Sequence, residues 1–521
     1  MSSSFSDKSL VQPRAGFTFL AHQETGVRWM LAREEAGAAV CRGGILGDDM
    51  GLGKTCQTIG LIKNSPLDLR TLIICPAPLM AGWTDELQAC GFQVSVLLGS
   101  SCWSVSEEPM AQMVGETKTA KQTTIYLTSY AKACMYKKAL ATSEVPFGRI
   151  ILDEGHAIRN GRATSRWMSC MAIAKRATCR WILSATPVHN GSSDWKHLCW
   201  WLRVRCSASD IPELASVIML RRTMEELRGA IEALPPSPRF VDHDLSIPTD
   251  SAEGRLFRAL CDQFDSVVEN SAVSGLIKLE LYMRIQQFLV HPQIYVEAMR
   301  AKLGRGAYPR ADWVSEDDGT GGAGATKWTA CLAEIRRAVT DKVGAIVFCN
   351  FHAEMDKVAA VASGLGASVF SIRGGMGSDK VGEAVIAARE ACAAGSPVVV
   401  VVQIVSGGVG LNLQFCRRVL FLSQHWNPAV VHQAVGRAVR IGQRAVVEVH
   451  FFRVVDDVLE NIDRRMVQLH LTKIAGAQEI CSSLYEGFAP LKEIPSSLSE
   501  EHEMRQHPSA TDAEDAQEDP C

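Results

Sequence analysis

At 521 residues the chain is too long for a single hydrophobic core, so two or three domains are expected. Hydrophobic residues make up 47% and charged residues 21%, and no apolar run approaches the length of a membrane span, which indicates a globular protein without a membrane segment. The 17 cysteines form no C-x-x-C pair, which argues against a disulfide framework and a zinc site and favours an intracellular protein.

The net charge of −3 is unevenly distributed along the chain. Residues 481–521 hold ten acidic and two basic residues, which leaves the rest of the chain with a charge of +5. A mildly basic body is compatible with contacts to the phosphates of a nucleic acid. Residues 478–521, in which acidic side chains are in excess, are predicted to form a disordered tail.

The first stretch that carries chemistry is GGILGDDMGLGKT, which resembles a phosphate-binding loop. The strict pattern G-x-x-x-x-G-K-[ST] requires a glycine where this chain has Asp48. Gly51 and Gly53 let the backbone turn tightly, with its N–H groups toward an anion. A helix predicted from Lys54 to Ile62 adds the positive end of its dipole.

In such a loop Lys54 contacts the β- and γ-phosphates of a nucleotide, and the hydroxyl of Thr55 binds Mg²⁺. The alternative is a strand–turn–helix unit with a surface lysine. The candidate nucleotide-binding residues of the loop are Asp48, Asp49, Met50, Gly51, Leu52, Gly53, Lys54 and Thr55.

Apolar runs typical of buried parallel strands occur in two groups. They are predicted at 71–75, 94–98, 124–129, 149–154 and 180–186, and again at 345–350, 368–372, 397–403, 418–423 and 446–452. Two α/β domains follow from this repetition. Between them lie a turn-rich break at 233–240, helices near 252–270 and 274–290, and a flexible break at 315–327.

Two polar groups are predicted at neighbouring strand ends, where open α/β sheets place their chemistry. Asp153 is a candidate ligand of Mg²⁺, and Glu154 can orient and deprotonate an attacking water. A capping carboxylate would explain one of these acids, but not the pair together with His156. Ser184 and Thr186 can sense the γ-phosphate, although a simple turn before a proline is the alternative.

The second domain contains HWNPAVVHQAVGRAVRIGQ. Asn427 and Pro428 are predicted to begin a helix. Gln433, Arg437 and Arg440 then fall on one helical face. Two arginines from a separate domain suit a phosphoryl transition state as arginine fingers, whereas the alternative is a solvated basic stripe.

From residue 17 to 477 these motifs, in this order, resemble the Swi/Snf helicase-like ATPases of helicase superfamily two. LAHQETGVRWML is similar to the opening segment of that family, which implies that Gln23 contacts adenine. DDMGLGKT is similar to its phosphate loop, and CPAPLMAGW, LTSY, LDEGH, LSATP, MLRRT and GGVGLNL follow. The family implies a coupling role for His156, Ser184, Thr186, Gly410 and Gln433.

The resemblance implies two RecA-like α/β domains with parallel sheets, helical insertions between and within them, and the acidic tail. The expected ranges are 15–205 for the first lobe, 206–325 for helical insertions and linker, and 326–477 for the second lobe. The motifs are most similar to the subgroup of helicase-like transcription factor. A RING module is not expected, because no cysteine lies between Cys261 and Cys331.

The implied function is an ATPase that uses Mg²⁺, translocates along double-stranded DNA and remodels DNA-bound protein such as nucleosomes, in repair or transcription and in the nucleus. One alternative is a helicase that separates strands, against which the long insertions argue. The other is a non-catalytic binding protein with a degenerate second lobe, suggested by Val381, Val405 and Gly436 at positions where the family usually has charged residues.

Overall fold

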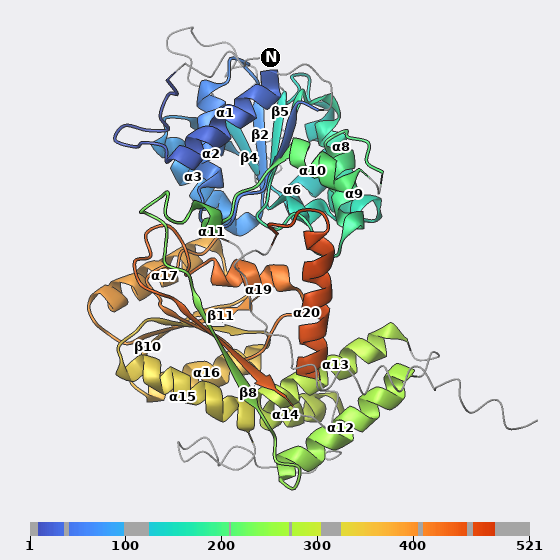
Figure 1. Cartoon of the computed structure of the whole chain (residues 1–521), viewed down its shortest axis with the longest axis vertical. Coiled ribbons are helices and arrows are strands. Elements are labelled where there is room, and N and C mark those ends of the chain that lie inside the picture. Colours follow the sequence, from blue (N-terminus) through green and yellow to red (C-terminus); the bar gives the residue numbers. More distant parts are fainter. Residues whose placement is uncertain are drawn as a thin grey trace, which may run out of the picture.

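The computed structural model describes residues 9–35, 41–97, 124–207, 210–269, 274–303, 325–404, 410–455 and 462–484. Figure 1 shows two α/β lobes stacked along the long axis of the molecule, with a group of helices below the second lobe. Both lobes are built around parallel sheets, as predicted. Val405 and most of the acidic tail lie outside the described residues.

The first lobe contains a seven-stranded parallel sheet in the order β3-β4-β2-β5-β6-β1-β7. Its strands are β1 (Gly43–Leu46), β2 (Thr71–Cys75), β3 (Gln93–Val96), β4 (Thr124–Ser129), β5 (Arg149–Asp153), β6 (Cys179–Leu183) and β7 (Met219–Leu220). The central strands consist almost entirely of buried residues, because helices cover both faces of the sheet.

Two helical layers enclose this sheet. One face packs against α1 (Ala21–Glu35), α2 (Lys54–Asn64) and α3 (Met80–Ala89). The other face packs against α6 (Tyr130–Met135), α7 (Lys137–Thr142), α8 (Ser165–Ile173), α9 (Ser192–Trp201) and α10 (Ile211–Ile218). The predicted helix after the glycine-rich loop is therefore confirmed as α2, two residues longer than expected.

The second lobe contains a six-stranded parallel sheet in the order β10-β11-β9-β12-β13-β8. Its strands are β8 (Arg239–Leu245), β9 (Ala345–Cys349), β10 (Ser368–Ile372), β11 (Val398–Gln403), β12 (Arg418–Phe421) and β13 (Glu448–Val454). Helices α15 (Thr326–Thr340) and α16 (His352–Gly364) cover one face, and α17 (Ser378–Ala393) and α19 (Pro428–Val435) cover the other.

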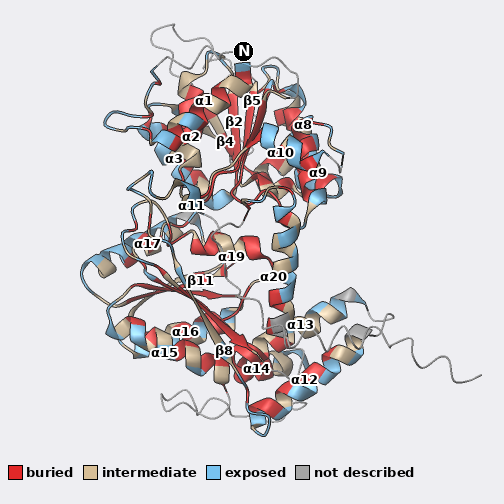
Figure 2. Cartoon of the chain, in the orientation of Figure 1, coloured by how far each residue is buried: buried red, intermediate tan, exposed pale blue. Residues whose placement is uncertain are grey.

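Three further helices, α12 (Ala252–Glu269), α13 (Gly275–Val290) and α14 (Pro292–Leu303), pack around a separate apolar cluster below the second lobe. The long helix α20 (Ile462–Gln478) runs beside the second lobe toward the first. Figure 2 shows the central strands of both sheets buried and the outward faces of the helices partly exposed. None of the described helices is long and apolar enough to cross a membrane.

All ten predicted strands are present, with ends within about three residues of the expected ones. Of the other three strands, β1 leads into the glycine-rich loop, whereas β7 and β8 were missed, and both of these fall within 206–325, the range assigned to helical insertions and linker. Strand β7 has only two residues, too few for a pattern, and joins the first sheet beyond its expected end at 205. Strand β8 is an edge strand of mixed polarity, and it joins the second sheet long before the expected start at 326. None of the fifteen described cysteines forms a disulfide.

Candidate nucleotide site between the lobes

The glycine-rich loop connects β1 to α2 and depends on glycine at two positions. Gly51 and Gly53 have φ angles of 85° and 81°, in the left-handed region that favours glycine. A Cβ atom on Gly53 would lie 2.4 Å from the side-chain nitrogen of Gln23. The loop can therefore bring its backbone close to another group only because both residues lack side chains.

Lys54 begins α2 and its ammonium group points back into the loop. Nζ donates to the carbonyl oxygens of Asp48 at 2.7 Å and Asp49 at 3.2 Å. An ammonium group has three donors, so these two bonds leave one for a further acceptor. Burial lowers the pKa of Lys54, while the nearby Glu154 and Asp153 favour its charged form.

Gln23, which the family resemblance predicts to contact adenine, lies against the loop. Its Oε1 accepts from the backbone of Leu20 at 3.1 Å, and its Nε2 donates to the carbonyl of Leu52 at 3.4 Å. His22, which the sequence analysis did not single out, places Nε2 2.9 Å from the same carbonyl. The start of α1 thus fixes the turn at Leu52.

The two aspartates of the loop face the arginines of MLRRT. Arg222 contacts the buried carboxylate of Asp48 through both Nε, at 2.9 Å, and Nη2, at 2.5 Å. Arg221 donates from Nη2 to Asp49 at 2.7 Å, and its Nη1 donates to the carbonyl oxygens of Gly47 and Ala185. The carboxylates of Asp48 and Asp49 thus hold the loop to the two arginines, while the backbone carbonyls of the same aspartates accept from Lys54.

The acidic pair lies at the end of β5, as the sequence predicted. The carboxylate of Asp153 accepts from Trp83 Nε1 at 2.7 Å and from the backbone N–H of Glu154 at 3.0 Å. Tyr130 donates its hydroxyl proton to the carbonyl of Asp153. Burial, together with the charge of Glu154, raises the pKa of Asp153 to about 6. Trp83 and Tyr130 were missed as individual residues, although the quoted CPAPLMAGW and LTSY contain them.

Glu154 is one of only three non-glycine residues with a positive φ among the described residues, at 50°. Such a conformation requires support from the surroundings and concentrates at functional sites. Its Oε2 lies 3.3 Å from Nδ1 of His156, and that nitrogen is 3.1 Å from Oγ of Ser184. Burial lowers the pKa of His156 to about 3, so the ring is neutral near neutral pH.

Helix α19 of the second lobe begins as predicted, because Asn427 caps it by accepting from the N–H of Ala429 and Pro428 occupies its first turn. Its buried Gln433 donates from Nε2 to Thr186 Oγ1 at 3.2 Å and to Glu154 Oε2 at 3.4 Å. The second lobe thus contacts both polar strand ends of the first lobe.

The expectation that Gln433, Arg437 and Arg440 share one helical face is wrong. Helix α19 ends at Val435, and the following segment continues as turns from Gly436. The residue expected to be charged is here a glycine, which weakens the helix at this position. Both arginines nevertheless remain close to the first lobe.

Arg437 is buried, and burial lowers its pKa to about 10 while Glu154 favours the charged form. The stem of Arg440 is so near Gly51 that a Cβ atom there would lie 3.1 Å from its Cγ. Gly410, with a φ of 84°, packs as closely against Leu79 of the first lobe. Thr55 is half-buried in the first turn of α2.

Comparison with known proteins finds a family match in each lobe. Residues 22–236 match the family described as SNF2-related domain, and residues 326–442 match the helicase conserved C-terminal domain. The chain belongs to the Snf2 family. This confirms the family resemblance drawn from the motifs, and the two matched Snf2 regions are those that contribute Lys54, Glu154 and Gln433.

Relatives of this Snf2 protein come from distant organisms. The "Probable global transactivator" of Orgyia pseudotsugata multicapsid polyhedrosis virus is 27% identical over 86% of this chain and 88% of its own length. The "Putative ATP-dependent helicase/translocase YwqA" of Bacillus subtilis is 24% identical over 87% of this chain and 48% of its own length. For the longer relatives, which include proteins named RAD5, the chain spans less than half of each.

A solved structure titled "Sulfolobus solfataricus SWI2/SNF2 ATPase core in complex with dsDNA" is 20% identical, over 91% of this chain and 96% of its own, with a TM-score of 0.37.

Proposed function

We propose that this Snf2 protein hydrolyses ATP in the cleft between its lobes and uses the cycle to move along double-stranded DNA and remodel DNA-bound protein, nucleosomes included. The observation that supports this most directly is the contact of Gln433 with both Thr186 and Glu154 across the lobes. Gln433 belongs to one lobe and contacts the acidic strand end of the other. Such a contact can couple ATP hydrolysis to a change in the arrangement of the lobes.

The residues present fit a nucleotide with its magnesium ion. The glycine-rich loop supplies backbone N–H groups, Lys54 retains a donor for the β- and γ-phosphates, and Gln23, to which the family resemblance assigns adenine, lies beside the loop. Thr55 and Asp153 would hold Mg²⁺, which neutralises developing charge on the phosphates when bound.

Glu154 is the proposed base that orients and deprotonates the attacking water. Its raised pKa, caused first by burial, suits a group that must accept a proton. Arg437 and Arg440 are the proposed arginine fingers, since both approach the first lobe from the second and the charge of Arg437 already faces Glu154.

Double-stranded DNA is the proposed track because the family resemblance implies it and because the chain outside its tail is mildly basic. Recognition through phosphates would give binding with little sequence preference and strong salt dependence. A nuclear location and a role in repair or transcription are proposed on the same family grounds.

The test is the rate of ATP hydrolysis without nucleic acid and with duplex DNA, single-stranded DNA or RNA. We expect the largest stimulation with duplex DNA and no displacement of an annealed strand. Lys54→Ala should abolish turnover, while Lys63→Ala, at the other end of α2, should not. Turnover near wild type in Lys54→Ala would overturn the enzymatic proposal, and efficient strand displacement would favour a helicase instead.

A further inference from the structure

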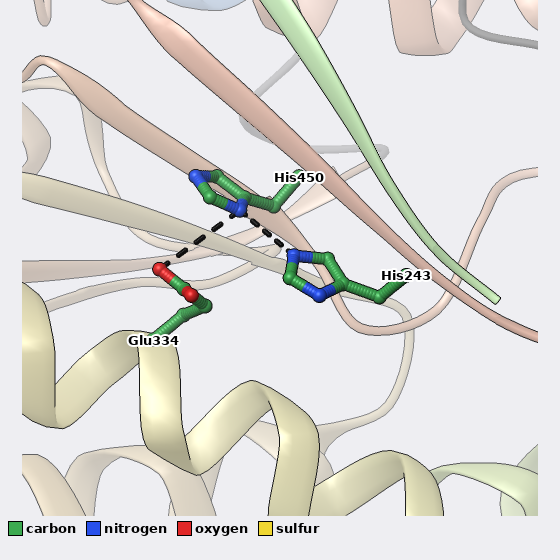
Figure 3. Close-up of side chains that lie close together, drawn as sticks. All are labelled: His243, Glu334 and His450. Atoms are coloured by element: carbon green, nitrogen blue, oxygen red, sulfur yellow. Dashed lines mark hydrogen bonds and ion pairs between the residues drawn. The ribbon is translucent and has the colours of Figure 1, made fainter. Parts of the chain in front are cut away.

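Two histidines and a glutamate converge in the second lobe, away from the proposed nucleotide site. Figure 3 shows His243 on β8, His450 on β13 and Glu334 on α15, with their polar ends toward one another. Nε2 of His243 lies 2.9 Å from Nδ1 of His450, and Oε2 of Glu334 lies 3.9 Å from that same Nδ1. One ligand atom from each residue lies within 4.8 Å of the others.

The fold, rather than sequence proximity, brings these side chains together. The parallel register pairs His450 with Val241, so His243, two residues later on β8, points to the same face of the sheet. Helix α15 covers this face, with Trp328 and Ile335 in one apolar cluster with Phe452. Helix α19, which carries Gln433, covers the opposite face (Figure 1).

Two polar atoms of the cluster lack a hydrogen-bond partner among the described residues. Oε2 of Glu334 and Nε2 of His450 are both buried, and the His450 side chain is only 3% exposed. The nearest cation to Glu334 is Arg337, at 3.9 Å from the other carboxylate oxygen, too far for a hydrogen bond. A buried carboxylate oxygen without a donor is unfavourable unless a cation satisfies it.

We propose that His243, His450 and Glu334 bind one divalent transition-metal ion, with Zn²⁺ as the best fit. Two imidazole nitrogens and a carboxylate are a known zinc donor set, in which a water molecule completes the tetrahedron. His243 and Glu334 are partly buried as residues, whereas His450 is buried.

The distances are close to those of a metal site but not identical to it. Ligand atoms about 2.0–2.1 Å from zinc in a tetrahedron lie roughly 3.3 Å apart. The two imidazole nitrogens would therefore separate by a few tenths of an ångström, and Glu334 would move inward. The competing arrangement is a direct hydrogen bond between two neutral histidines, which leaves the Glu334 oxygen without a partner.

The proposed ion would stabilise the place where the chain enters the second lobe. Strand β8 is an edge strand, held to the sheet only by β13, and it carries the chain from the first lobe to the helices α12–α14. An ion shared by β8, β13 and α15 would fix this strand. A ligand that binds only the folded state raises the free energy of unfolding with the logarithm of its concentration relative to the dissociation constant.

The experiment uses the full chain, stripped with a chelator and titrated with Co²⁺ and Zn²⁺ alone. Co²⁺ has visible d–d absorption, and thiolate ligands add charge-transfer bands in the near ultraviolet, which distinguish sites made by the many cysteines from a nitrogen–oxygen site. We expect the chain to bind one equivalent of Co²⁺ tightly and without thiolate bands. Addition of Zn²⁺ should raise the midpoint of thermal unfolding. His243→Gln and Glu334→Gln should each weaken this equivalent by at least about tenfold.

The matched control is His352→Gln, since His352 is exposed at the start of α16 in the same lobe. It should keep the wild-type affinity and thermal shift. Equal affinity in all four proteins, or an equivalent that shows only thiolate bands, would overturn the proposal. The wild-type titration needs no variant to fold, so absence of any tight equivalent there would also overturn it.

Discussion

Nε2 of Gln433 lies 3.2 Å from Oγ1 of Thr186. A glutamine of the second lobe therefore donates a hydrogen bond to a threonine that follows strand β6 of the first lobe. The same nitrogen is 3.4 Å from Glu154. His189, just beyond Thr186, adds a second contact across the lobes, with Nδ1 2.9 Å from Nδ2 of Asn427. The lobes therefore meet through hydrogen bonds at the proposed catalytic centre.

Gln433→Ala should separate nucleotide binding from turnover. The change removes hydrogen bonds that exist only when the lobes are together, and a loss of about 1.4 kcal/mol corresponds to a roughly tenfold lower population of the closed arrangement. We expect turnover to fall about tenfold with little change in ATP affinity. Gln468→Ala, exposed on α20, is the control. An equal loss in affinity would place Gln433 in nucleotide binding instead.

Glu154→Gln tests the base. Glutamine keeps the shape and leaves Asp153 for the metal, but it cannot accept a proton. Hydrolysis should fall by at least about a hundredfold, the usual contribution of a general base, while ATP binding persists. The comparison is Glu383→Gln, on the exposed side of α17. Loss of nucleotide binding in a well-folded Glu154→Gln protein would show that the acidic pair is misassigned.

Arg222→Met tests the buried ion pair behind the loop. Asp48 is fully buried, and Arg222 provides its bidentate contact, so the variant leaves a buried charge without its partner. We expect a loss of about 3 kcal/mol in the free energy of unfolding by denaturant. Adding Asp48→Asn should restore part of it, because the buried charge is then removed.

The control for that pair is Arg228→Met. Arg228 pairs with Glu225 on the surface, and pairs of this kind contribute less than about 1 kcal/mol. If both arginine variants proved equally mild, Asp48 and Arg222 would not form the proposed anchor of the loop.

The strands were predictable because most are buried on both faces and read as continuous apolar runs. Strand β8 was not, since its sequence RFVDHDL mixes charges with apolar residues at the edge of the sheet. The loop was recognisable from Gly51, Gly53 and Lys54, yet its partner Arg222 lies far along the chain, and spacing gives no signal for such a contact.

The same reason explains why no zinc site was expected, although Thr55 and Asp153 were predicted to bind Mg²⁺. The cysteine spacings argued against zinc, whereas His243 and His450 are about two hundred residues apart and meet only through the register of β8 and β13. Glu334 joins them because α15 packs on that face. Contacts of this kind depend on tertiary packing, which local patterns do not encode.

Glu354 gives a prediction about pH. Its buried carboxylate accepts from the backbone N–H groups of Asn350 and Phe351 and from the hydroxyl of Ser423. Burial nevertheless dominates and raises the pKa of Glu354 from 4.5 to about 7. Between these two values the folded protein binds the proton more strongly than the unfolded chain does. This contribution to stability is therefore present below pH 4.5 and is lost as the pH rises through 7.

Glu354→Gln removes this titration. The variant is less stable at pH 5, because an amide cannot replace a carboxyl that accepts three hydrogen bonds, but its deficit relative to wild type should shrink as the pH rises to 8. The slope of the difference cannot exceed about 1.4 kcal/mol per pH unit for one proton. Urea unfolding of both proteins at several pH values measures it. Glu383→Gln, on an exposed surface, should show a constant difference. If the Glu354→Gln deficit were also constant from pH 5 to 8, the carboxyl would be ionised throughout and its burial would not control the pKa.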